Sequence, residues 1–176
     1  MPSDFAIVIP NMSQIILIAH DIRSTHNVGS ILRTADCLGA DMVYLTGYTP
    51  YPMVEKDDRL PHLAKKLTAQ IHKTALGAEI STKWSHNSDI KAVINNLRSQ
   101  EVEIVALEQS PDSEPISNLE PKGDIALIVG NEVTGLESAV LDTVDRVVEI
   151  PMSGSKESLN VAQATAIGLY HLSINL

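Results

Sequence analysis

Polar side chains that can hydrogen-bond a ligand occur in three separate segments of the chain. Asn27 and Arg33 lie in HDIRSTHNVGSILR, Glu132 lies in GNEVTGLE, and Ser158 and Asn160 lie in PMSGSKESLN. Amide, hydroxyl and carboxylate groups can hold a polar ligand by hydrogen bonds, and a guanidinium can bind an anion or stabilise developing negative charge. Each segment follows a short apolar run, so the three can converge at the edge of a sheet where α/β proteins bind ligands.

Glycines in the same loops indicate a ligand that the backbone approaches closely. Gly130, Gly135 and Gly154 leave room for backbone N–H and C=O groups to read the edge of an adenine ring. No G-x-G-x-x-G follows the first apolar run, and no G-x-x-x-x-G-K-[ST] occurs anywhere. A cradle for a pyrophosphate or triphosphate is therefore unsupported, and a ligand without phosphates is favoured.

Short apolar runs alternate with segments of helical spacing, which predicts an α/β fold with a mostly parallel sheet covered by helices on both faces. A helix is expected after Asn27 as its N-cap, with Gly39 as its end, and another behind Ser88 and Asp89. The last helix is apolar or small on nearly every side from Val161 onward. The expected strands are residues 15–19, 42–45, 79–84, 102–107, 124–129 and 146–150.

The length of 176 residues suits one domain, expected over residues 15–176, with residues 1–14 as an N-terminal tail or arm. Residues 46–62 and 109–123 are rich in proline and polar groups and are expected to be loops. We expect neither an export signal nor a membrane-spanning segment. The single Cys37 excludes an intramolecular disulfide and a multi-cysteine zinc site, so we expect no metal and a reducing, cytoplasmic location.

The formal net charge of −9 is unevenly distributed along the chain. Residues 1–73 hold seven Lys and Arg against seven Asp and Glu, whereas residues 74–176 hold six against fifteen. A surface that contacts phosphate is therefore expected in the first part. Aromatic residues make up only 3% of the chain, too few for a broad surface on which bases could stack.

Taken in order, HNVGSILRTAD, IVGNEVTGL and IPMSGSKESLNVAQA resemble the three motifs of the SpoU/TrmH branch of the SPOUT RNA ribose methyltransferases. The resemblance covers the chain from about residue 15 to the C-terminus. It implies transfer of a methyl group from S-adenosylmethionine to a ribose 2'-hydroxyl in tRNA or rRNA, with tRNA favoured. It also implies a SPOUT-type fold with a C-terminal trefoil knot and a homodimer.

The resemblance assigns roles to individual residues. It implies that the catalytic group comprises Asn27, Arg33, Glu132, Ser158 and Asn160, and that the cofactor is bound by Leu107, Gly130, Asn131, Ile150, Met152 and Leu159. Because arginine stays protonated near neutral pH, we expect Arg33 to clamp a phosphate and stabilise charge on the 2'-oxygen rather than accept its proton. Lys156, Lys65 and Lys66 are the further candidates for RNA contacts.

Each of these residues also has a purely structural interpretation. Asn27 and Ser158 both suit helix N-caps, with Asn160 in the first turn after Ser158. Arg33 can be a solvated side chain paired with Asp36 at i+3.

Glu132 can favour a helix start through the helix dipole, or it can hold Arg33 or the cofactor loop in place. Lys156, Lys65 and Lys66 can be exposed lysines without a partner. The residues alone leave these alternatives open.

Two other functions are compatible with parts of the sequence. A non-catalytic RNA-binding or assembly protein could keep the fold after losing the reaction, although the five intact motif residues argue against it. An unrelated α/β nucleotide enzyme is disfavoured because phosphate-binding glycine motifs are missing. Cofactor binding without methyl transfer would favour the first, and binding of ATP or NAD the second.

Overall fold

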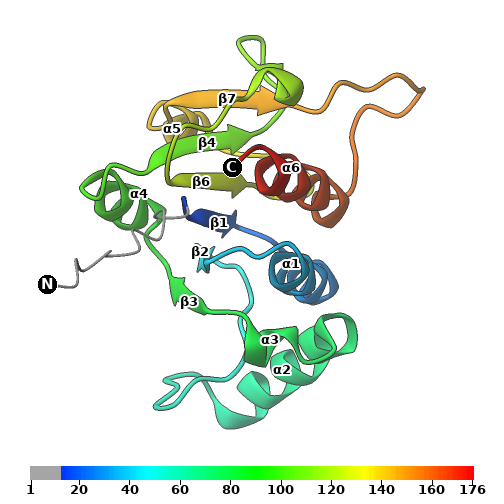
Figure 1. Cartoon of the computed structure of the whole chain (residues 1–176). Coiled ribbons are helices and arrows are strands. Elements are labelled where there is room, and N and C mark those ends of the chain that lie inside the picture. The colour runs from blue at the N-terminus through cyan, green and yellow to red at the C-terminus, as the bar shows by residue number, and fades with distance from the viewer. Residues whose placement is uncertain (1–12) are drawn as a thin grey trace, which may run out of the picture.

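A computed structural model describes residues 13–176, which form a seven-stranded sheet with the order β3-β2-β1-β6-β4-β7-β5 (Figure 1). Every pair of neighbouring strands is parallel. The predicted α/β fold with a parallel sheet is confirmed. The strands are β1 Ile15–His20, β2 Met42–Thr46, β3 Trp84–Asn87, β4 Glu103–Leu107, β5 Glu114–Pro115, β6 Ile125–Val129 and β7 Arg146–Glu149.

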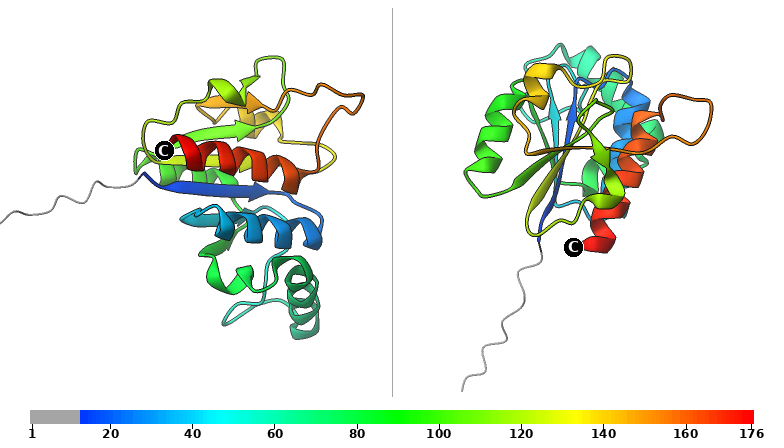
Figure 2. Two further views of the ribbon diagram at one scale, coloured as in Figure 1. Left: turned by 45° about the vertical axis from the view of Figure 1, so that its right-hand side comes forward. Right: turned by 90° about the horizontal axis from the view of Figure 1, so that it is seen from above.

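Helices cover both faces of the sheet. Figure 2 shows α1 and α6 side by side on one face, with α4 on the other. Each face buries its own apolar cluster, one around Leu17, Leu127 and Ile31, the other around Ile18, Ile128 and Ile94. The helical elements are α1 Thr25–Cys37, α2 Pro61–Ala75, α3 Ala78–Ser81, α4 Ile90–Arg98, η1 Ile116–Asn118, α5 Ser138–Leu141 and α6 Val161–Asn175.

Five of the six predicted strands match observed strands within two residues at each end, and the sixth was wrong. Residues 79–84 were predicted as a strand, but residues 78–81 form the single helical turn α3. The turn is favoured because Leu76 and Gly77 adopt left-handed conformations after α2, and the Glu79 carboxylate accepts a hydrogen bond from Gly77 N at 3.0 Å. The sheet gains its edge strand β3 only afterwards, beginning at Trp84.

The predicted loop at 46–62 is irregular from Gly47 to Leu60, but the 46–73 region is not a loop throughout. Its second part is helix α2, which packs against α1. The close approach depends on Gly29, because a Cβ there would collide with the Ile71 carbonyl and the Thr74 hydroxyl of α2. Lys65 and Lys66 therefore lie on a fixed helix.

The C-terminal helix α6 is packed against the sheet and the segment that connects β4 to β6. A Cβ at Gly168 would lie 2.6 Å from Leu127 Cδ2, and His171 Nε2 is 2.8 Å from the Leu119 carbonyl oxygen. The trefoil knot stays a prediction. The expected tail at 1–14 lies almost wholly outside the described residues, and no helix within residues 13–176 is long and apolar enough to cross a membrane.

Candidate functional site

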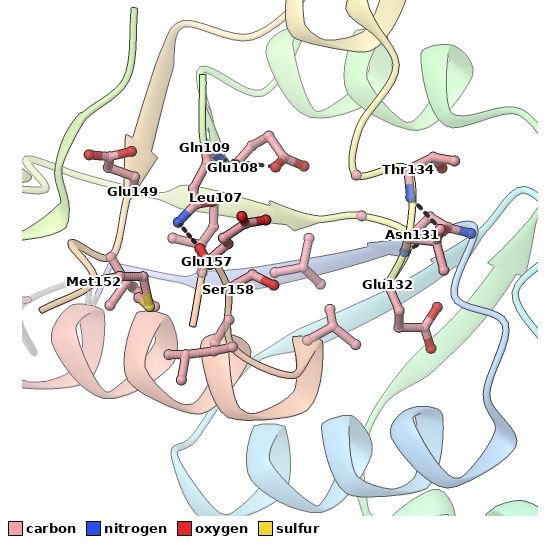
Figure 3. Close-up of a pocket in the computed structure, with 18 residues that line it drawn as sticks. Leu107, Glu108, Gln109, Asn131, Glu132, Thr134, Glu149, Met152, Glu157 and Ser158 are labelled. Atoms are coloured by element: carbon pink, nitrogen blue, oxygen red, sulfur yellow. Dashed lines mark hydrogen bonds between the residues drawn. The ribbon is translucent and has the colours of Figure 1, made fainter. Parts of the chain in front are cut away.

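A pocket of about 330 Å³ lies at the carboxyl ends of β4, β6 and β7, the edge expected to bind ligands in a parallel sheet. Its walls come from the ends of these strands, the turn after β6, the loop before α6 and the start of α6 (Figure 3). All six residues expected to bind the cofactor line it: Leu107, Gly130, Asn131, Ile150, Met152 and Leu159.

One wall of the pocket is a tight turn that runs from Gly130 to Gly135. Gly130 cannot carry a side chain, because a Cβ there would lie 2.8 Å from the carbonyl carbon of Gly135. Gly135 has a φ of +66°, and a Cβ on it would collide with the Glu108 carboxylate. That carboxylate accepts a hydrogen bond from Leu136 N at 2.8 Å, so β4 and the turn after β6 are joined beneath the pocket.

Beside the pocket, three motif residues that are far apart in the sequence form one hydrogen-bonded cluster. Asn27 Nδ2 donates to Glu132 Oε1 at 2.7 Å, and Asn160 Nδ2 lies 3.2 Å from Asn27 Oδ1. Asn27 is on α1, Glu132 follows β6 and Asn160 precedes α6. The predicted convergence of the three strand-exit segments is therefore observed.

Glu132 holds the start of α1 in addition to the Asn27 side chain. Its carboxylate also accepts hydrogen bonds from Arg23 N at 3.0 Å and Ser24 N at 3.2 Å. Partial burial raises the pKa of Glu132, but the hydrogen bonds from Arg23, Asn27 and Ser24 outweigh it, and the net pKa is lower than usual. Glu132 is thus held as a carboxylate that orients the Asn27 amide.

Two of the predicted helix caps were wrong. The N-cap of α1 is Ser24, whose side chain accepts from Asn27 N, because Asn27 lies inside the helix and its side chain is used by Glu132. The N-cap of α6 is Asn160 rather than Ser158, since Asn160 Oδ1 accepts from Ala162 N at 2.9 Å. Asn160 therefore caps one helix and contacts Asn27 with the same amide, while Ser158 lines the pocket.

Within one chain, Arg33 does not lie at this cluster. It is exposed on α1, six residues after Asn27, which corresponds to about 9 Å along the helix. A contact between Glu132 and Arg33, one of the roles left open for Glu132, is not observed, because the hydrogen bonds of Glu132 come from Arg23, Ser24 and Asn27. The expected pair between Arg33 and Asp36 is also not formed within residues 13–176, because Asp36 Oδ1 accepts from Ser81 Oγ.

The three candidate lysines also lie outside the pocket lining. Lys156 is exposed in the loop before α6, and Lys65 and Lys66 are exposed on α2. Figure 1 shows that the loop before α6 extends away from the body of the protein.

Sequence reasoning missed the acidic character of the pocket. Four carboxylates line it, those of Glu108, Glu132, Glu149 and Glu157, whereas no Lys, Arg or His is among its described lining residues. Position alone could have identified two of them, because Glu108 follows β4 directly and Glu149 ends β7. An acidic wall suits a ligand with positive charge.

A metal site is not indicated in the part of the chain that the structure describes. No group of three His, Cys, Asp or Glu side chains there is arranged to hold a metal ion.

Comparison with known proteins places the same segments in a known family. Residues 14–170 match the model of the SpoU rRNA Methylase family. The chain is 29% identical over 156 residues to 23S rRNA (guanosine-2'-O-)-methyltransferase RlmB of Bordetella pertussis, covering 89% of this chain and 58% of that protein. It is 29% identical to tRNA (guanosine(18)-2'-O)-methyltransferase of Borreliella burgdorferi, covering 90% and 66% respectively.

The fold is also that of a solved structure. The chain superimposes on the AdoMet-bound rRNA methyltransferase from Sinorhizobium meliloti with a TM-score of 0.78 and 23% identity, over 93% of this chain and 57% of that one. The chain thus spans less than two thirds of the length of each of these three proteins.

Proposed function

The chain belongs to the SpoU rRNA Methylase family, as its three motifs predicted, and we propose that it transfers a methyl group from S-adenosylmethionine to a ribose 2'-hydroxyl of RNA. The observation that carries this proposal is the cluster of Asn27, Glu132 and Asn160 beside a pocket lined by every residue expected to bind the cofactor.

The residues of the pocket fit S-adenosylmethionine. Gly130 and Gly135 keep the turn after β6 tight, so its backbone forms part of the pocket wall, and Leu107, Ile150 and Leu159 supply apolar contacts for an adenine ring. The cofactor supplies a methyl group on a positively charged sulfonium, and carboxylates such as Glu157 and Glu108 complement that charge. We assign cofactor binding to the six predicted residues and to the acidic wall.

The polar cluster acts on the RNA side of the pocket. The Asn27 amide is fixed by Glu132 and Asn160, so its remaining hydrogen-bonding capacity is aimed in one direction. Ser158, with the exposed part of Asn160, would orient the ribose with its 2'-hydroxyl toward the pocket, where bound S-adenosylmethionine would supply the methyl group. The 2'-oxygen gains the methyl group and loses its proton to water or to a phosphate of the RNA.

Arg33 belongs to this site in our proposal although it is remote from it in one chain. The exposed side chains of Ile167 (40%), Tyr170 (56%) and Ile174 (60%) form an apolar stripe on α6, the helix that packs beside α1. A homodimer that buries this stripe also brings in the exposed face of α1. We propose that Arg33 reaches the site of the partner, where its guanidinium clamps a phosphate of the RNA and stabilises charge on the 2'-oxygen.

The other implied properties are retained as proposals. A trefoil knot is supported by the packing of α6 against the β4–β6 connection, and tracing the chain in an experimental structure tests it. A cytoplasmic location is supported by one exposed cysteine without a disulfide partner, and cell fractionation tests it. We propose tRNA as the substrate, which is supported by the similarity to a tRNA (guanosine(18)-2'-O)-methyltransferase. We propose that Lys65, Lys66 and Lys156 contact the RNA, because exposed lysines suit phosphates.

The test is methyl transfer from labelled S-adenosylmethionine to unmethylated total tRNA and total rRNA, followed by mapping of the modified ribose. We expect incorporation into one RNA at a 2'-oxygen, and loss of incorporation in Arg33→Ala. Near-normal turnover of Arg33→Lys would contradict the forked phosphate clamp, because an ammonium cannot bind two oxygens in that geometry. Cofactor binding without incorporation into any RNA would instead support the non-catalytic alternative.

A further inference from the structure

A second hollow of about 580 Å³ lies next to the cofactor pocket, at the carboxyl ends of β1, β2 and β3. Arg23, Tyr48, Tyr51, Arg59 and His86 are among its lining residues. The two cavities share a wall, because Asn131, which lines the first, donates from Nδ2 to the Tyr48 hydroxyl at 2.5 Å. Arg23 N likewise donates to Glu132, so whatever fills the second hollow lies beside the polar cluster.

The outer wall of the hollow is an irregular loop that Arg59 braces. Its guanidinium donates to the carbonyls of Tyr51 and Pro52 and to the Asp57 carboxylate. The Asp57 carboxylate neutralises the charge of Arg59, and the hydrogen bond from Arg59 lowers the pKa of Asp57. The Tyr51 ring is covered on both sides, by Arg59 at 3.5 Å and by His86 with ring centroids 3.9 Å apart, so this wall is preformed and its ring faces are occupied.

Tyr48 is the aromatic side chain that remains available. It is 59% exposed, yet it is held at both ends, by Asp21 Oδ1 through its backbone N at 3.0 Å and by Asn131 through its hydroxyl. Gly47 before it has a φ of +66°, and a Cβ there would collide with the Asp21 carboxylate. An exposed ring that is already immobile can stack on a base with little further loss of entropy.

Arg23 supplies the free charge of the hollow. It is exposed, and within residues 13–176 its side chain takes part in no hydrogen bond or ion pair. The lining of the hollow holds Arg23, Arg59 with its charge balanced by Asp57, and no Asp or Glu among the described residues. The lining of the cofactor pocket instead holds four Glu and, among the described residues, no Lys, Arg or His. Adjacent cavities of opposite charge suit two different ligands, a cation in one and a phosphate in the other.

We propose that this hollow is a subsite for the RNA nucleotide next to the one that is methylated. The base of this neighbouring nucleotide stacks on Tyr48, and Arg23 binds the phosphate that joins the two nucleotides. The nucleotide is unpaired, because a base inside a duplex has no free face to offer. This inference rests on the proposed methyl transfer to RNA and adds to it the part of the protein that holds the neighbouring nucleotide.

The test compares Tyr48→Ala, Tyr48→Phe and Arg23→Gln, with Lys91→Gln on α4 as a control for the loss of an exposed charge elsewhere. Steady-state methyl transfer gives KM for RNA and kcat, and calorimetry gives Kd for S-adenosylmethionine. Tyr48→Ala should raise KM roughly 5- to 150-fold through loss of stacking, with Tyr48→Phe close to wild type. Arg23→Gln should also raise KM. The slope of log KM against log salt should fall by about one, which is the change expected for the loss of one phosphate contact.

The outcomes separate the subsite from the function on which it depends. If the wild-type protein methylates no RNA, the proposed function fails. If it methylates RNA but Tyr48→Ala and Arg23→Gln behave like Lys91→Gln, only the subsite is wrong. A Tyr48→Phe variant as impaired as Tyr48→Ala, with weaker cofactor binding, would mean that Tyr48 serves only to hold Asn131. Thermal melting monitors folding, and Tyr48→Leu replaces Tyr48→Ala if the smaller side chain unfolds the loop.

Discussion

Replacing Glu132 by glutamine tests the cluster that joins the three motifs, because it removes the charge and keeps the shape of the side chain. The three groups around the carboxylate are all donors: Arg23 N, Ser24 N and Asn27 Nδ2. A glutamine has one acceptor oxygen, so its NH₂ group must face at least one donor. The best arrangement keeps the oxygen toward Asn27 and Ser24 and leaves Arg23 N unpaired.

The loss of stability follows from counting these bonds. A hydrogen bond to a charged group contributes about 1.5–3 kcal/mol and a neutral one about 0.5–1.5 kcal/mol, so one bond is lost and two are weakened. Glu132 is only partly buried, and water reaches the freed donors, which reduces the total to about 1–3 kcal/mol. Methyl transfer should fall further, because the Asn27 amide is no longer fixed.

The effect should depend on pH in one direction. The pKa of Glu132 is lower in the folded protein than its usual value, because the hydrogen bonds from Arg23, Asn27 and Ser24 exceed the opposing effect of burial. Its contribution to stability is therefore fully present above the unfolded pKa of about 4.3 and is lost as the pH falls through the lower folded value. The difference between wild type and Glu132→Gln should be full at neutral pH and shrink below about pH 4.

Urea denaturation at neutral and acidic pH measures this difference, with Glu137→Gln as the control. Glu137 is exposed and lies five residues further along, and its side chain accepts no hydrogen bond from the residues that the structure describes. An unfolding midpoint equal to that of wild type, or a difference that stays constant down to acidic pH, would refute the assignment of Glu132 as an ionised acceptor of these three bonds.

Two further predictions concern the cofactor and the dimer. Gly130→Ala should weaken binding of S-adenosylmethionine roughly tenfold or more by calorimetry, because the new Cβ meets Gly135 and forces the turn apart. Gly154→Ala is the matched control, since a Cβ there meets nothing within 4 Å, and equal affinities would refute the close approach. A purified mixed dimer of Arg33→Ala and Asn160→Ala chains should retain about half of the wild-type methyl transfer if Arg33 serves the partner's site, because one site is then intact. Activity no higher than that of the separate variants would show that Arg33 acts within its own chain.

Periodicity in the sequence predicted five of the seven strands, because buried parallel strands are continuous apolar runs that differ from their surroundings, and it missed the edge strands β3 and β5. It failed at residues 79–84, where Ile80 and Trp84 resemble a strand but the chain first makes a helical turn. Glu79 contacts His72 and Gly77 there, and the Trp84 indole N–H donates to the Glu79 carbonyl at 2.8 Å. These are side-chain contacts between segments, which a hydrophobic pattern does not contain.

Residue type predicted the helix caps less well than the motif residues. Asn27, Ser158 and Asn160 are all good N-cap residues, so type alone could not decide which of them caps a helix. The decision depends on partners that are distant in the sequence: Glu132 takes the Asn27 side chain, and Ser24 then caps α1. The motifs contain Asn27, Glu132 and Asn160, which the fold brings together, but the bonds between these residues could be found only from the folded chain.

The net charge of −9 is explained in part by where the carboxylates lie. Glu108, Glu132, Glu149 and Glu157 face the cofactor pocket, so part of the acidic excess lies where a sulfonium is expected rather than where RNA would bind. The neighbouring hollow is lined by Arg23 and by Arg59, whose charge Asp57 already balances. The net charge of −9 opposes a general positive field around the protein. Affinity for RNA must therefore come largely from contacts in the site, such as a base on Tyr48, and from individual basic side chains.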